Sequence, residues 1–117
     1  MENKSVTRTD LLTVHLSEIH CISNVEIKQI VIPPAEKAEY HLHPCPVIGH
    51  IVSGKLLFQE EGSLPKILYA GQAFYEPKNQ PILHFDNASD HEPLVFIAYY
   101  LLESNEDMIT LLPLPKE

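Results

Sequence analysis

The sequence predicts an all-β domain of the sandwich or barrel type, and three observations support this fold class. Short apolar or alternating runs recur along the chain and are bounded by Pro, Gly and Asn. The turns between these runs come roughly every 8–12 residues, which is the spacing of sandwiches and barrels. Nearly all of the 10 prolines lie at the ends of runs, where a missing N–H does not break a ladder. The length of 117 residues predicts one domain, residues 1–117.

The first half of the chain contains four expected strands. Residues 25–32 form the first, which ends at Pro33-Pro34, because prolines cannot lie inside a central ladder. An extended run over residues 37–43 also stops at a proline. Residues 47–52 and 56–59 flank a Ser-Gly-Lys turn and form the next pair.

The second half of the chain continues this pattern. Strands are expected at residues 65–69 and 73–75, which are separated by an Ala-Gly turn. A proline-bounded loop precedes residues 82–85, and an Asp-Asn turn precedes the long apolar run at 93–102. Residues 10–22 carry apolar side chains at helical spacing but also read as a strand. We expect a loop followed by a strand there.

Charge and composition exclude several classes of partner. Asp and Glu number 16 against 8 Lys and Arg, which gives a net charge of −8 with neutral histidines. Nucleic acids and anionic membrane surfaces both bind through Lys and Arg, so neither partner is expected. The longest apolar run, Leu94–Leu102, has nine residues, whereas a spanning helix needs about 20. Because no signal peptide is visible either, a cytoplasmic protein is expected.

The cysteines and the glycines indicate no familiar active site. Cys21 and Cys45 lack metal-binding spacing. We expect buried free thiols, with a single disulfide as the alternative. The chain contains no glycine-rich phosphate loop and no nucleophile motif, so no organic cofactor is expected.

Histidine is the residue type that stands out, with seven in the chain. His41 and His43 lie two apart in an extended run, so both side chains project from one face of a strand. Two adjacent imidazoles are half of a site for Fe, Mn, Ni, Cu or Zn. The alternative is an exposed pair, or a partly buried pair bonded to the backbone. His84 lies on a later run, and the fold would have to bring it near.

Two runs together carry a family resemblance. The run His41–Gly54 resembles the first motif of the cupin superfamily, which is HxH, three or four residues, Glu, six residues and Gly. The run Gly71–Asn87 resembles the second motif, in which Gly, Pro, His and Asn recur in that order. The likeness covers about residues 11–112 and places the domain core there. It implies a double-stranded β-helix, a jelly-roll barrel with a ligand cavity at one mouth.

The resemblance also implies a metal site, although two ligand positions depart from the family pattern. Many cupins bind one divalent metal through the first motif's two histidines and glutamate and the second motif's histidine. His41 and His43 match the first two ligands, but Val47 occupies the glutamate position and Ile82 the second histidine position. His84 shares a face with Ile82 on a regular strand. The expected metal ligands are therefore His41, His43 and His84.

The expected ligand pocket is partly apolar and borders this site. It comprises Val47, Phe74, Glu76, Ile82, Phe85 and Tyr99. Glu76 is the one nearby carboxylate considered as a substitute for the missing glutamate ligand. Ala35 stands where the family has a glycine, six residues before His41.

Two functions remain open at this point. By family analogy, the chain is a small metal-dependent oxygenase or isomerase acting on a small organic molecule. The alternative is a non-catalytic cupin that binds a small apolar or anionic ligand without metal. Leu94–Leu102 and Ile109–Leu114 carry more apolar surface than one small barrel needs. Since small cupins form dimers, we expect a homodimer built by sheet-to-sheet contact, partly through the N-terminal segment or the C-terminal tail.

Overall fold

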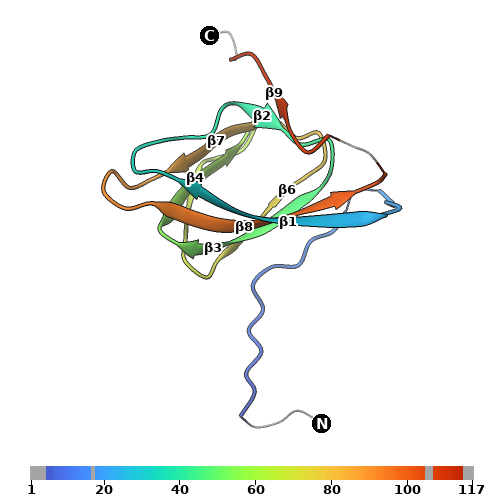
Figure 1. Cartoon of the computed structure of the whole chain (residues 1–117), viewed down its shortest axis with the longest axis horizontal. Coiled ribbons are helices and arrows are strands. Elements are labelled where there is room, and N and C mark those ends of the chain that lie inside the picture. The colour runs from blue at the N-terminus through green and yellow to red at the C-terminus, as the bar shows by residue number, and fades with distance from the viewer. Residues whose placement is uncertain (1–4, 17, 105–106, 115–117) are drawn as a thin grey trace.

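In a computed structural model, the chain forms two antiparallel β-sheets that pack face to face as a jelly roll (Figure 1). The structure describes residues 5–16, 18–104 and 107–114, and no helix occurs among them. The strands of this part are β1 Asn24–Ile32, β2 His41–Leu42, β3 Val47–Ser53, β4 Lys55–Glu60, β5 Lys66–Tyr69, β6 Ala73–Glu76, β7 Ile82–Asn87, β8 Leu94–Leu102 and β9 Thr110–Leu111. The predicted all-β jelly roll is confirmed.

Most strands lie where the sequence predicts them, with two differences. The run expected over 37–43 is ordered as a strand only at β2, and Lys37 forms an isolated bridge with Asp86. The strand expected within residues 10–22 does not form in the part of this segment that the structure describes. Its apolar side chains meet no partner strand, and Ile19 is 95% exposed. Without a neighbouring strand to accept and donate backbone hydrogen bonds, this extended segment does not become a strand.

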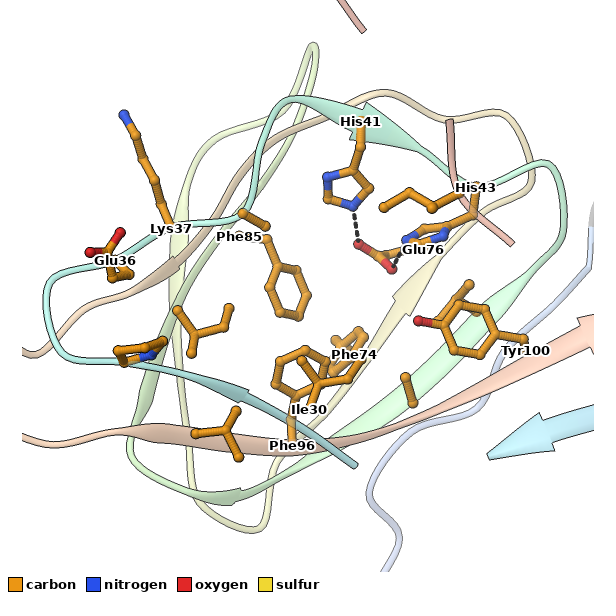
Figure 2. Close-up of a pocket in the computed structure, with 17 residues that line it drawn as sticks. Ile30, Glu36, Lys37, His41, His43, Phe74, Glu76, Phe85, Phe96 and Tyr100 are labelled. Carbon is orange, nitrogen blue, oxygen red and sulfur yellow. Dashed lines mark ion pairs between the residues drawn. The ribbon is translucent and has the colours of Figure 1, made fainter. Parts of the chain in front are cut away.

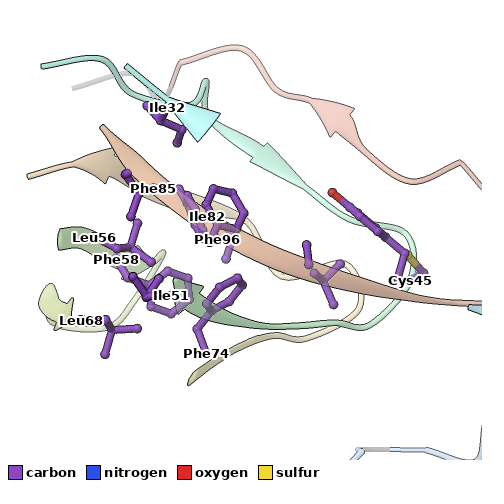
Figure 3. Packing of buried hydrophobic residues seen from close by; sticks show 14 of the residues in the cluster. Ile32, Cys45, Ile51, Leu56, Phe58, Leu68, Phe74, Ile82, Phe85 and Phe96 are labelled. Carbon is purple, nitrogen blue, oxygen red and sulfur yellow. The ribbon is translucent and has the colours of Figure 1, made fainter. Parts of the chain in front are cut away.

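The two sheets have different strand orders. One sheet has the order β1-β8-β3-β6, and the other has the order β5-β4-β7-β2-β9. Alternation along β3, β6 and β8 turns every second side chain inward between the sheets. Four phenylalanines meet there, with ring centroids 4.9–6.1 Å apart (Figure 3). They are Phe58, Phe74, Phe85 and Phe96. Such contacts each add about 0.5–1.5 kcal/mol beyond area burial.

Gly49 on β3 makes room for this aromatic cluster. A Cβ at this position would lie 2.3 Å from Cζ of Phe74 and 2.6 Å from the carbonyl oxygen of Ile97. Only glycine allows the Phe74 ring to lie across β3, so Gly49 helps to set the position of one cavity wall.

Asn87 ties the end of β1 to the loop that precedes β8. Its buried amide nitrogen donates to the carbonyl oxygens of Ile32 at 3.1 Å, Pro33 at 3.1 Å and Glu92 at 2.7 Å. Its carbonyl oxygen accepts from the backbone N–H of Ser89 at 2.9 Å. These bonds hold the β1–β2 connection that forms one wall of the barrel mouth.

Neither cysteine forms a disulfide. Cys45 is buried, whereas Cys21 is exposed. The expected burial therefore applies to Cys45 alone. Ala35, at the family's glycine position, has a φ of 63°, which is the left-handed conformation that glycine adopts most easily.

Candidate metal centre

Three buried side chains from the two sheets meet inside the barrel mouth: His41 on β2, His43 just after β2, and Glu76 at the end of β6. Their ligand atoms all lie within 4.8 Å of one another. Figure 2 shows the two imidazoles pointing toward the Glu76 carboxylate. The HxH spacing places both histidines on one face of an extended segment. Alternate residues of β6 face the barrel interior, and Glu76 is one of them.

Backbone carbonyls fix the orientation of both imidazole rings. Nδ1 of His41 lies 2.6 Å from the carbonyl oxygen of Glu39, and Nδ1 of His43 lies 2.5 Å from that of Met108. A carbonyl oxygen can only accept, so each Nδ1 carries the hydrogen and donates it. In the neutral rings, both Nε2 atoms then present lone pairs to the interior, which is the tautomer that binds metal.

The Glu76 carboxylate faces these two lone pairs. Its Oε2 lies 3.0 Å from Nε2 of His43, and its Oε1 lies 3.4 Å from Nε2 of His41. A carboxylate and a lone pair are both acceptors, so this arrangement needs a cation between them, either a proton on Nε2 or a metal ion. Oε1 is buried without a hydrogen-bond partner, which is costly unless a cation satisfies it. The residues therefore fit a divalent ion.

Without a metal ion, the Glu76 carboxylate and the His43 imidazole each stabilise the charged form of the other. Burial alone raises the pKa of Glu76, but the interactions of its carboxylate with the His41 and His43 imidazoles outweigh burial and lower this pKa below its ordinary value. Burial lowers the pKa of His43, whereas the hydrogen bond to Glu76, the Glu76 charge and the Met108 carbonyl together raise it above its ordinary value. A proton on His43 thus occupies the space that a metal ion would take.

His84 lies outside this group. Its side chain is 43% exposed, and its Nδ1 lies 3.0 Å from Oδ2 of Asp86. The pairing of β4 with β7 is irregular, because Gln59 opposes His84 while the next residue, Glu60, opposes Ile82. This bulge inserts one residue and reverses the alternation. Ile82 and Phe85 are therefore buried, and His84 turns outward. The sequence assigned His84 as a ligand because a regular strand would give it the same facing as Ile82.

A cavity of about 490 Å³ opens beside the three ligands. Of the residues predicted for the pocket, Val47, Phe74, Glu76 and Phe85 line it. Ile82 is fully buried in the core and pairs with His41 across β2 and β7.

Tyr99 lies on the other face of β8, away from the cavity, and its hydroxyl is 3.3 Å from Nε2 of His50. Its neighbour Tyr100 lines the cavity instead. Because every residue of β8 is apolar or aromatic, the sequence contains no signal that distinguishes these two facings.

Comparisons with known proteins give one matching family and several similar solved structures. A family model described as cupin domain matches residues 28–100. No curated protein matches the chain. A cupin-like protein from Thermotoga maritima is 27% identical, with a TM-score of 0.66, and the match covers 76% of this chain and 65% of that chain.

Two further solved structures are similar. An RmlC-like cupin family protein with a double-stranded β-helix fold, from Methanocaldococcus jannaschii, is 27% identical with a TM-score of 0.59, and the match covers 66% of this chain and 69% of that one. An oxalate oxidase in complex with the substrate analogue glycolate is 21% identical with a TM-score of 0.63 over 74% of this chain. This chain spans 45% of the length of that oxidase, and the likeness shows the fold alone.

Proposed function

The chain belongs to the cupin superfamily, and from this premise we propose that it is a metal-dependent enzyme acting on a small organic molecule. The proposed ligands are Nε2 of His41, Nε2 of His43 and the carboxylate of Glu76. The observation that carries the proposal is the approach of two imidazole Nε2 atoms to a buried carboxylate that has an unpartnered oxygen. In this set Glu76 takes the place that the sequence assigned to His84.

Two histidines and one carboxylate leave coordination positions open on a divalent ion such as Fe, Mn, Ni, Cu or Zn. When bound, such an ion supplies Lewis-acid or dioxygen chemistry. The carbonyls of Glu39 and Met108 hold the two rings in their ligand orientation. The apolar walls next to the centre limit the access of water, and they leave room for a substrate beside the open positions.

The alternative is a non-catalytic cupin that binds a ligand without metal. The buried, unpartnered oxygen of Glu76 favours the metalloprotein. Tag-free protein loaded separately with Fe²⁺, Mn²⁺, Ni²⁺, Cu²⁺ or Zn²⁺ tests this by elemental analysis and by assays with small phenols, thiols and diketones. About one ion per chain together with turnover is the expected result. Stoichiometric metal without turnover on any substrate would favour the binding protein, and no retained metal would overturn the centre itself.

We also infer that the chain forms a homodimer. The outer face of the sheet β1-β8-β3-β6 is largely apolar, although Gln29 and His50 also face outward. On β1 it exposes Val25, Ile27 and Val31, with Ile27 63% exposed. The N-terminal segment extends away from the barrel (Figure 1) and exposes further apolar side chains. A second copy supplies both a bare apolar sheet and an apolar arm, so it is the partner that this surface fits.

The remaining expectations concern location and domain organisation. Within the described residues, no helix is long and apolar enough to cross a membrane. A cytoplasmic location and a single domain over residues 1–117 stay predictions.

A further inference from the structure

The cavity beside the proposed centre divides its polar groups between two ends. His41, His43, Glu76 and the Tyr100 hydroxyl lie at one end, and Glu36 and Lys37 belong to the β1–β2 connection at the other (Figure 2). The remaining lining residues are apolar. Figure 2 shows the Lys37 ammonium pointing away from the cavity. No other Lys or Arg of the described chain lines the cavity.

This distribution limits the charge that a ligand can carry. A divalent ion held by one carboxylate and two neutral imidazoles leaves one net positive charge at the centre. A ligand with a single negative oxygen group compensates that charge. A second negative group that is too far away to bind the ion would lie against apolar walls without a partner, which is costly in a buried site.

The apolar walls of the cavity determine which kind of molecular body fits beside the charged head group. The rings of Phe74 and Phe96 both pack against Phe85, with centroids 5.2 and 4.9 Å away. Ile30 on β1 lines the same cavity. A volume of about 490 Å³ lies within the range of small-molecule sites, about 300–1,000 Å³. Such walls favour an uncharged aromatic or branched aliphatic body.

Tyr100 is placed to orient the head group. Its ring contacts that of His43 with the centroids 5.7 Å apart, and in Figure 2 its hydroxyl points into the cavity. This phenol O–H can donate a hydrogen bond to a ligand oxygen.

We propose that this cavity selects small molecules that carry one monoanionic oxygen head group, such as a carboxylate or an enolate, on an uncharged apolar body. The head group binds at the open positions of the centre and accepts a hydrogen bond from Tyr100, while the body packs against the phenylalanines. This selectivity rests on the proposed function, because the centre supplies the positive charge. It excludes dianions whose second carboxylate lies at the far end of the apolar body and cannot reach the ion.

Calorimetric titration of the Zn²⁺-loaded protein tests this selectivity, with the metal content measured before and after. The probes are phenylacetate, its neutral counterpart 2-phenylethanol, and the dianion para-phenylenediacetate, whose second carboxylate lies across the aromatic ring from the first. Phenylacetate is expected to bind at least about ten-fold more tightly than either of the others. Binding of para-phenylenediacetate as tight as that of phenylacetate would overturn the inference and leave the metal centre intact. A protein that retains no Zn²⁺ would instead overturn the proposed function, and this selectivity with it.

Two tyrosine variants test the orienting hydrogen bond. Tyr100→Phe should weaken phenylacetate binding by about 5- to 10-fold with unchanged metal content. Tyr99→Phe is the matched control on the other face of β8 and should leave the affinity unchanged. Equal effects of the two variants would overturn the role of Tyr100.

A charge introduced into the wall tests the selectivity independently. Ile30→Lys adds a second positive group to the cavity, and it should shift the preference toward para-phenylenediacetate by about ten-fold or more. A folded Ile30→Lys protein with the wild-type preference would overturn the charge argument. If this variant does not fold, the wild-type titration decides the question.

Discussion

Glu76 on β6 is the direct antiparallel partner of Val47 on β3, and both side chains are buried inside the barrel. Side chains paired in this way have Cβ atoms about 4.5–5.5 Å apart. A carboxylate on β6 therefore reaches the space that a glutamate at position 47 would occupy. The site keeps a carboxylate although the motif position on β3 is apolar.

His84 should be dispensable for metal binding. Its ring is half-exposed and bonded to Asp86 rather than directed at the centre. His84→Ala should retain the wild-type metal content by elemental mass spectrometry, with a change in unfolding free energy within about 0.5 kcal/mol. Loss of metal in this variant would mean that β7 lacks the bulge and that His84 completes the site.

Metal affinity should fall on acidification at an unusually high pH. His43 must lose its Nε2 proton to bind an ion, and its raised pKa means that protons compete above pH 6.5, the ordinary histidine value. Chelator competition should show apparent Zn²⁺ affinity falling by about ten-fold or more from pH 8 to pH 6. An affinity that is constant over this range would contradict the assignment of His43 as a ligand.

The stability of the metal-free protein should change in the opposite direction. A raised histidine pKa contributes stability that is fully present below the unfolded value of about 6.5 and is lost as pH rises through the folded value. The lowered pKa of Glu76 affects stability only in acid, below about pH 4.5. Denaturant unfolding should therefore show less stability at pH 8 than at pH 6 without metal, and the reverse trend with Zn²⁺.

Much of the fold could be predicted from the sequence because its signals are local. Prolines and glycines mark the strand ends, and HxH in an extended run fixes the relative facing of His41 and His43. Glu76 was identifiable as a substitute carboxylate because it directly precedes Pro77 of the second motif. Its role as a ligand depends on the pairing of β3 with β6, and a local pattern does not specify such long-range register.

The outward turn of His84 and the inward turn of Tyr100 could not be predicted in the same way. The bulge in β7 arises from its pairing with β4. From the sequence alone, either Leu83 or His84 could face the barrel interior. On β8, apolar side chains occupy both faces, so the alternation that normally identifies the buried face is missing.

Asn87 should contribute strongly to stability. Asn87→Ala leaves the carbonyls of Ile32, Pro33 and Glu92 without their shared donor in a buried site. A loss of about 2–4 kcal/mol is expected in denaturant unfolding. Asn24→Ala, at an exposed position, is the control and should change stability by less than about 1 kcal/mol. Equal effects would contradict the anchoring role of Asn87.

The homodimer predicts a specific sensitivity to charge on β1. Ile27→Glu places a carboxylate on the exposed apolar face, so light scattering should detect one chain per particle instead of two. Lys28→Glu, at the next position of the same strand, should leave the dimer intact. A wild-type protein with one chain per particle would contradict the proposed interface.

The most direct test of the metal centre is the metal content of Glu76→Gln after reconstitution, measured beside wild type and Glu60→Gln. Glu60 is a partly buried carboxyl at the end of β4 and outside the ligand group. Wild type and Glu60→Gln should each retain about one ion per chain, whereas Glu76→Gln should lose at least about ten-fold in affinity, because a neutral amide replaces the anionic ligand. Full metal affinity in Glu76→Gln would contradict the assignment of this β6 carboxylate as the third ligand.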